Sequence, residues 1–174
     1  MKFKTDRLIC QSLSLAEYAE FEASREPKWD GFTNPYKHLV EGPSPLVHRI
    51  PRVKKDPTFA EIGLVLAIAD GEIIGSAGFH DFPDENGMIE IGFGIVPDKQ
   101  RQGYGLELLH GMWKEIANRS DVKILRYTVS PENEASMHII KKLGFDLVGE
   151  QIDEEDGLEL IYESSIENYL KEYS

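Results

Sequence analysis

The hydrophobic pattern of the first third of the chain predicts one helix followed by an irregular stretch. Residues 5–11 alternate weakly between apolar and polar and predict a first strand. Ser14 with Glu17 three positions later is the pattern of a capping box, which predicts a helix that runs to about Ser24. Residues 25–57 contain six prolines, so we expect a loop with short helical pieces there. A long irregular stretch in a compact domain is more often a binding loop than filler.

The middle of the chain has the pattern of a sheet. Apolar runs are separated by residues that favour tight turns, and an Asp-Gly pair between two such runs is a strong signal for a type I′ hairpin. These features predict strands over 62–69, 72–79 and 88–96, with turns at Asp70-Gly71 and 83–87.

The last third mixes helices with further strands. Apolar residues at helical spacing predict an amphipathic helix over 104–119, and Gly144 ends a second helix. The expected elements are helices over 104–119 and 133–143, strands over 122–129, 145–152 and 158–163, a turn at Asp156-Gly157 and a short final helix. Hairpins in the middle with crossover helices after them indicate an α+β fold rather than the strict alternation of a doubly wound sheet.

Charge is distributed unevenly along the chain. The net charge is −12, and residues 150–174 alone carry nine acidic residues and one basic residue. Such a surface is a poor partner for nucleic acid or for an anionic membrane. It is compatible with a cationic substrate such as an amine, although solubility alone would also explain it.

The compartment follows from what the sequence lacks. No run of about 20 apolar residues is present, and the first residues have no apolar region typical of a signal peptide. The single cysteine, Cys10, excludes an intrachain disulfide. We therefore expect a cytoplasmic protein.

The strand predicted over 88–96 carries the first sign of chemistry. Its isoleucines and Phe93 share one face, and Glu90, Gly92 and Gly94 share the other. Glycine weakens a strand interior, so two glycines beside a carboxylate suggest close approach of a ligand to the backbone. A bulge or a tight helix contact is the alternative explanation.

A candidate anion site follows directly after this strand. The sequence Gln-Arg-Gln-Gly-Tyr-Gly over 100–105 precedes the amphipathic helix. Glycines allow successive N–H groups to point the same way, the helix start adds a positive dipole end, and Arg101 can add a charge-assisted contact. The segment lacks the Gly-Lys-Ser/Thr of a P-loop and the third glycine of a dinucleotide fingerprint.

These motifs resemble those of the GNAT superfamily of acyl-CoA-dependent N-acyltransferases. Residues 100–105 match its pyrophosphate loop, Gln/Arg-x-x-Gly-x-Gly/Ala, at every specified position. Residues 130–136 and the Lys-Leu-Gly-Phe over 142–145 are similar to its later helix and strand start. The opening Thr-Asp-Arg-Leu over 5–8 and the pairing of Asn133 with Ser136 look most like the branch of the ribosomal-protein-alanine N-acetyltransferases.

The resemblance implies a fold and an activity. The expected fold is α+β: a single GNAT-like domain over 1–174, with a mixed, mostly antiparallel central sheet, helices on both faces and a splayed central strand. Within it, 25–57 would form a proline-rich loop on the acceptor side, and 88–149 the acyl-CoA-binding core. The implied activity is transfer of an acetyl group from acetyl-CoA, as co-substrate, to a primary amine, with a homodimer as the family's common assembly.

The resemblance also implies roles for individual residues. The central strand would pair with the pantetheine arm, the loop would bind the pyrophosphate, and the later helix would contact the reactive end of acetyl-CoA. The implied cofactor-binding residues are Ile95, Val96, Gln100, Arg101, Gln102, Gly103, Tyr104, Gly105, Leu106, Asn133, Ser136 and Lys142. Ser136 would also protonate or stabilise the leaving thiolate, a role that many family members give to a tyrosine.

Glu90 is the candidate general base, acting directly or through a water, because an amine must lose a proton before it attacks a thioester. His80 could be an alternative base, although a histidine in a surface turn is the favoured interpretation, and His38 and His48 could line an acceptor site. No two histidines have metal-ligand spacing, so we predict no metal. A non-catalytic acyl-CoA-binding module and, less well supported, an unrelated nucleotide binder remain alternatives.

Overall fold

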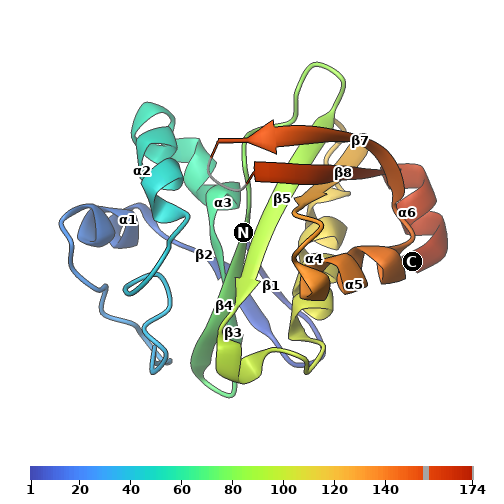
Figure 1. Cartoon of the computed structure of the whole chain (residues 1–174). Helices are drawn as coiled ribbons and strands as arrows, with labels where there is room; N and C mark the ends of the chain where they lie inside the picture. The colour runs from blue at the N-terminus through green and yellow to red at the C-terminus, as the bar shows by residue number, and fades with distance from the viewer. Residues whose placement is uncertain (155–156, 174) are drawn as a thin grey trace. The chain divides into compact units, whose positions relative to one another are not determined.

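A computed structural model describes residues 1–154 and 157–173 of the chain. Its helices and strands are β1 (Lys2–Lys4), β2 (Ile9–Ser12), α1 (Leu15–Glu22), α2 (Leu46–Lys55), α3 (Ala60–Gly63), β3 (Val65–Ala69), β4 (Glu72–Phe79), β5 (Met88–Ile95), α4 (Tyr104–Ile116), β6 (Ile124–Val129), α5 (Glu134–Leu143), β7 (Asp146–Asp153), β8 (Gly157–Ser165) and α6 (Ile166–Tyr173), with short 3₁₀ turns at Pro57–Phe59 and Pro97–Lys99. From β3 onwards the helices and strands follow the predicted order, and before β3 the structure adds the strand β1 and the helices α2 and α3 (Figure 1).

The sheet is mixed and mostly antiparallel, as predicted. Its strand order is β1-β2-β3-β4-β5-β6-β8-β7. The pairs β1–β2, β2–β3, β3–β4, β6–β8 and β7–β8 run antiparallel. The pair β5–β6 runs parallel, and parallel neighbours need a crossover, which the chain makes through α4.

The chain divides into two compact units, which are described one at a time. The first unit comprises residues 1–80 and 93–112, and the second comprises residues 81–92 together with the chain from Trp113 onwards. Both β5 and α4 contribute residues to each unit. The prediction of a single domain over the whole chain stays a prediction.

The first unit contains β1 to β4 and shows the two local motifs that the sequence predicts. The Ser14 side chain accepts a hydrogen bond from the backbone of Glu17, and Glu17 reaches back to the Ser14 backbone, so the predicted capping box starts α1. Asp70 and Gly71 both have positive φ, 51° and 78°, as a type I′ turn between β3 and β4 requires. The core of this unit is built around β3 and β4, whose apolar side chains are almost fully buried.

The predicted first strand over 5–11 is wrong in its first half. Thr5 and Leu8 close a turn, because the Thr5 N–H donates to the Leu8 carbonyl at 3.0 Å and the Leu8 N–H donates to Thr5 Oγ1 at 3.0 Å. A threonine hydroxyl that satisfies a nearby backbone group competes with strand pairing. The strand that pairs with β3 is therefore the shorter β2.

Two boundaries in the first unit also differ from the prediction. Ile62 begins no strand but belongs to α3, which packs so closely that a Cβ added at Gly78 would lie 2.0 Å from the Gly63 carbonyl oxygen. The proline-rich segment contains a ten-residue helix, α2, with Pro51 inside it. Three basic residues in its last turn favour the helix there by interacting with the negative end of the helix dipole.

The second unit contains β6, β7 and β8 with α5 and α6. Asn133 caps the start of α5, and Gly144 ends it in the left-handed conformation with φ 64°. Trp113 stacks on Phe145 at 4.9 Å between ring centroids and meets Tyr169 edge-on at 5.7 Å, so α6 closes an aromatic core. Asp156, predicted to lie in the turn between the last strands, is outside the described residues.

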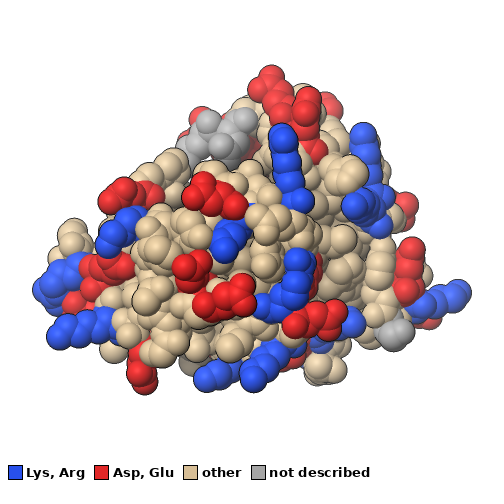
Figure 2. Space-filling view, turned by 90° about the horizontal axis from the view of Figure 1, so that it is seen from below, with Lys and Arg blue, Asp and Glu red and all other residues tan. Residues whose placement is uncertain are grey.

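The surface carries both signs of charge. Figure 2 shows Lys and Arg side chains interspersed with Asp and Glu over the face that it draws. Within residues 1–154 and 157–173, no helix is both long and apolar enough to cross a membrane. The acidic balance of the chain therefore does not produce a face of one sign in this view.

Candidate active site

The loop between β5 and α4, in the first unit, is shaped by side chains that bind its own carbonyls. Gln100 Nε2 donates to the Ile95 carbonyl at 2.9 Å, and Gln102 Nε2 donates to the Asp98 carbonyl at 3.2 Å. These bonds satisfy the carbonyl oxygens of Ile95 and Asp98. Gln100 and Gln102, predicted as cofactor ligands, thus also hold the loop in its conformation.

The loop leads its N–H groups into the first turn of α4. Arg101 and Gly103 both have positive φ, 59° and 85°. The first turn of a helix leaves N–H groups without intrahelical acceptors, and here the first backbone bond that closes a turn runs from the Glu107 N–H to the Gly103 carbonyl at 3.1 Å. The N–H groups of Tyr104, Gly105 and Leu106 precede it. This geometry is suited to a phosphate group.

Strand β5 extends beyond the residues that pair with β6. The parallel register runs from Met88 with Ile124 to Ile91 with Tyr127, and β5 continues to Ile95. Among the described residues, no heavy atom lies within 4 Å of a Cβ added at Gly94, so there is open space over this glycine. The end of β5 therefore has room for a side chain at Gly94, and the approach of a ligand there stays a prediction.

The two backbone positions predicted to hold pantetheine differ in what they offer. The Val96 N–H donates to the Ile74 carbonyl at 2.9 Å, and the Val96 carbonyl accepts from the Lys99 N–H at 2.9 Å. The Ile95 carbonyl accepts from the Gln100 side chain. The Ile95 N–H is therefore the group at this strand end that best fits the predicted role.

In the second unit, Glu90 is held by a hydroxyl on the neighbouring strand. Thr128 Oγ1 donates to Glu90 Oε1 at 2.6 Å. Glu90 stands opposite Arg126 in the β5–β6 register, but the Arg126 guanidinium pairs with Glu163 on β8, with Nε 2.8 Å from Oε1. The candidate base is a half-buried carboxylate oriented by a neutral donor.

Ser136 and Asn133 meet at the start of α5, also in the second unit. The Ser136 N–H donates to Asn133 Oδ1 at 3.1 Å, which makes Asn133 the helix cap. The Ser136 side chain forms a hydrogen bond with Tyr127. Burial raises the pKa of Tyr127 to about 12, and the Ser136 bond only partly opposes this. Lys142, the weakest predicted cofactor residue, is exposed in the last turn of α5.

A histidine in the proline-rich segment has a partner that the sequence did not indicate. His38 Nε2 lies 2.8 Å from Ser76 Oγ, and Ser76 on β4 is only 4% exposed. Burial lowers the pKa of His38 to about 4, so the imidazole is neutral at physiological pH. His38 and Ser76 are 38 residues apart, and neither belongs to a sequence motif, so no local signal could have paired them.

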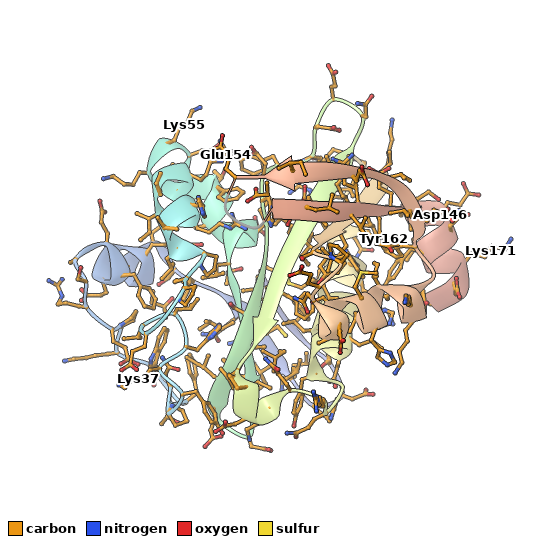
Figure 3. The ribbon with its side chains drawn as sticks, viewed as in Figure 1. Lys37, Lys55, Asp146, Glu154, Tyr162 and Lys171 are labelled. Carbon is orange, nitrogen blue, oxygen red and sulfur yellow. The ribbon has the colours of Figure 1, made fainter. Side chains whose placement is uncertain are left out.

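The aromatic residues of the same segment act as anchors. Trp29 lies between Phe21 and Phe32, with ring centroids at 6.2 and 5.6 Å. Its Nε1–H donates to Glu26 at 3.1 Å, and Lys37, labelled in Figure 3, binds the same carboxylate at 2.9 Å. Glu26 therefore links Trp29 and Lys37, and the aromatic contacts of Trp29 join the segment to Phe21 on α1.

The described residues contain no group of three or more His, Cys, Asp or Glu side chains placed to hold a metal ion. The chemistry available is that of backbone N–H donors at one loop and of a carboxylate and hydroxyls on β5, β6 and α5. Anion binding and proton transfer are the two functions that these groups support.

Comparison with known proteins identifies the family. The acetyltransferase (GNAT) domain matches residues 7–146, which is most of the chain. The chain therefore belongs to the GNAT acetyltransferase family. Among curated proteins, an uncharacterized N-acetyltransferase, YjdG, of Bacillus subtilis (strain 168) is 38% identical over 76 residues. That stretch is 44% of this chain and 45% of YjdG, so the match spans less than half of the relative's length.

Solved structures share the fold. A GNAT-family acetyltransferase from Bacillus anthracis matches with a TM-score of 0.66 at 20% identity, over 96% of this chain and 99% of that one. The ribosomal L7/L12 alpha-N-protein acetyltransferase RimL, in complex with coenzyme A, matches with a TM-score of 0.68 at 14% identity, over 95% and 98%. At these identities the likeness establishes the GNAT fold alone.

Proposed function

We propose that this chain is an acetyl-CoA-dependent N-acetyltransferase that acts on a primary amine by direct transfer. The observation that carries the proposal is the loop after β5, in which Arg101 and Gly103 take positive φ and lead into the free first turn of α4. A helix start preceded by such a loop binds phosphate oxygens well. The solved complex of RimL with coenzyme A, on the same fold, supports the choice of ligand.

The acceptor amine must be deprotonated before it attacks. A lysine-like amine has a pKa of about 10.4 and an α-amine about 7.7–8.0, so both are largely protonated at neutral pH. In our proposal Glu90 accepts that proton, directly or through a water, while Thr128 fixes the carboxylate. The attacking nitrogen forms the new C–N bond, and the C–S bond to coenzyme A breaks.

Two further groups serve the charge that develops during transfer. The oxygen of the tetrahedral intermediate needs a donor, and the Ile95 N–H is our candidate. In our proposal the Ser136 hydroxyl donates a hydrogen bond that stabilises the leaving thiolate, which takes its proton from the attacking nitrogen through water, and Tyr127 is the hydrogen-bond partner of Ser136. Because the pKa of Tyr127 is about 12, its phenol stays protonated and can donate to Ser136 in turn.

Transfer is tested by mixing the chain with acetyl-CoA and, in turn, a peptide with a free α-amine, a polyamine and an amino acid. Free thiol and the mass of the acceptor are measured. We expect thiol release that depends on one class of amine, with an acceptor heavier by one acetyl group. If coenzyme A binds but no amine is acetylated, the chain is the non-catalytic acyl-CoA-binding module instead.

Direct transfer is tested with the same assay on Cys10→Ala. Cys10 is fully buried, so we expect this variant to keep its turnover. Loss of turnover, together with a labelled acyl group on the wild-type protein, would establish an acyl-enzyme and contradict direct transfer.

A further inference from the structure

The turn at Thr5–Leu8 places an arginine against the loop that follows β5. Arg7 NH1 donates to the Gln102 carbonyl at 2.9 Å, and its guanidinium lies 4.2 Å from the centroid of the Tyr104 ring. A Cβ added at Gly103 would lie 3.3 Å from Arg7 NH2. One side chain therefore touches three consecutive residues of the loop, all within the first unit.

Glu107, in the first turn of α4, holds this arginine in place. Arg7 Nε donates to Glu107 Oε2 at 2.7 Å, and the Arg7 N–H donates to Oε1 at 2.8 Å. Thr5 Oγ1 donates to the same Oε1 at 2.5 Å. Burial works against ionisation of Glu107, but the hydrogen bonds from Thr5 and Arg7 outweigh it and lower its pKa.

The N-terminal segment is also fixed one turn further along α4. A Cβ added at Gly111 would lie 2.5 Å from the Phe3 ring and 2.9 Å from Thr5 Cγ2, so only glycine permits this approach. The side chains of Phe3 and Thr5 thus pack on α4 at Gly111, while Arg7 and Thr5 also bind Glu107. The position of Arg7 is set at both ends by contacts that do not involve the loop.

The positive charge of Arg7 is neutralised by an ion pair with Glu107. Its guanidinium pairs with the Glu107 carboxylate at 2.7 Å, which is only 16% exposed, so little net positive charge remains for a ligand. Arg101, exposed in the loop, is the cation suited to a phosphate. What Arg7 supplies is a rigid fork that fixes a carbonyl and an aromatic ring at once, which a lysine does not reproduce.

We propose that Arg7, held by Glu107 and Thr5, is a positioning residue that fixes the diphosphate-binding loop in the conformation that turns its N–H groups toward the ligand. The inference rests on the proposed function, because it takes coenzyme A as that ligand. By fixing the carbonyl of Gln102, Arg7 orients the peptide plane that carries the Gly103 N–H. Preorganised donors bind an anion more tightly than donors that must be ordered on binding.

The test compares two ligands that differ in the diphosphate. Dissociation constants for coenzyme A and for pantetheine, which lacks the diphosphate and nucleotide, are measured by calorimetry and by NMR titration respectively. The proteins are wild type, Arg7→Ala, Arg7→Lys and the matched control Arg25→Ala. Arg25 makes a two-bond ion pair with Glu20, Nε to Oε2 at 2.6 Å and NH2 to Oε1 at 3.1 Å, and both residues lie outside the loop.

We expect both Arg7 variants to weaken coenzyme A binding about tenfold and to leave pantetheine binding unchanged. Arg25→Ala should change neither affinity. An equal loss for both ligands would show a general effect on folding and would overturn the inference, as would wild-type affinity in Arg7→Ala. If wild type binds pantetheine and coenzyme A equally, or binds neither, the proposed function itself fails and the inference with it.

Glu107→Gln is a second variant, and it should perturb folding less than Arg7→Ala does. The amide keeps one oxygen to accept from Thr5 and the Arg7 N–H, but it no longer pairs with the guanidinium. We expect the same selective loss of coenzyme A affinity, smaller than in Arg7→Ala. Unchanged affinity in this variant would show that the ion pair does not position the loop.

Discussion

The loop after β5 and the polar cluster on β5, β6 and α5 differ in the groups proposed to act. In the loop these groups belong to the backbone, and in the cluster they belong to side chains. In the loop the proposed ligand groups are backbone N–H groups, and the side chains of Gln100 and Gln102 donate to the carbonyls of Ile95 and Asp98. In the cluster the backbone forms ordinary strands and a helix, and the proposed reactive groups are the side chains of Glu90 and Ser136. The first region is thus sensitive to conformation and the second to chemical identity.

The largest effect is expected from a change in the proposed chemical groups of the polar cluster. Glu90→Gln removes the base and keeps the shape, so we expect turnover to fall about 10²–10⁴-fold, the usual contribution of general base catalysis. Coenzyme A affinity, which depends on the loop, should not change. Steady-state kinetics and calorimetry on the same samples measure the two effects. Glu115→Gln, at an exposed position of α4, is the control, and equal turnover in both variants would remove Glu90 from the role.

The next largest effect is expected from a change in the backbone conformation of the loop. Gly103→Ala forces a side chain into φ 85° and toward Arg7, at a cost of about 1–2 kcal/mol for the left-handed conformation. Gly71→Ala carries a similar cost at φ 78° with open space around it. Both variants should melt at lower temperature, but only Gly103→Ala should bind coenzyme A more weakly, by about tenfold. A similar affinity in the two variants would contradict the loop assignment.

The His38–Ser76 pair lies in the first unit, as the loop does, but it depends on side chains and not on the backbone. Unfolded histidine takes up a proton near pH 6.5, whereas folded His38 does so only at about 4. Between these values the unfolded chain binds more protons, so His38 makes stability fall as pH falls, with a slope of up to about 1.4 kcal/mol per pH unit.

His38→Asn should remove that contribution, which denaturant titrations from pH 7 to pH 4 measure as a difference from wild type. His138→Asn, at an exposed position, is the matched control and should follow the wild-type curve. If the His38 variant and wild type lose stability in parallel over this range, His38 is not held neutral by burial.

The smallest effect should leave both regions untouched. Ser14→Ala removes the capping box at the start of α1 and should cost about 1 kcal/mol. For a chain of this size that lowers the melting temperature by about 2–4 °C. Ser14→Thr keeps the cap and should restore most of the loss. A change in coenzyme A affinity in either variant would mean that α1 is coupled to the loop.

Features set by neighbouring residues could be predicted from the sequence, and features set by distant partners could not. The capping box, the turn at Asp70-Gly71 and the end of α5 at Gly144 depend on residues within one turn of each other, and all three are present. The motif of the predicted phosphate loop is local for the same reason, and its binding role stays a prediction. The Arg7–Glu107 pair joins positions 100 residues apart and has no local signal.

Competition between local and distant partners also explains what was mispredicted. Residues 5–8 have a weak strand pattern, but Thr5 turns the chain and binds Glu107. Asn133 matches a ligand position of the family, and the structure adds that its side-chain oxygen caps α5. A motif residue can thus have a structural role that the motif does not reveal.

Ligand-dependent melting measures whether the loop after β5 binds the diphosphate of coenzyme A. The melting temperature is measured with acetyl-CoA, coenzyme A, ATP and NAD at equal concentration. A ligand at about 100 times its Kd adds about 2.7 kcal/mol of stability, which corresponds to a shift of several degrees. We predict that shift with acetyl-CoA and coenzyme A alone. A larger shift with ATP or NAD, or none with coenzyme A at millimolar concentration, would contradict the account.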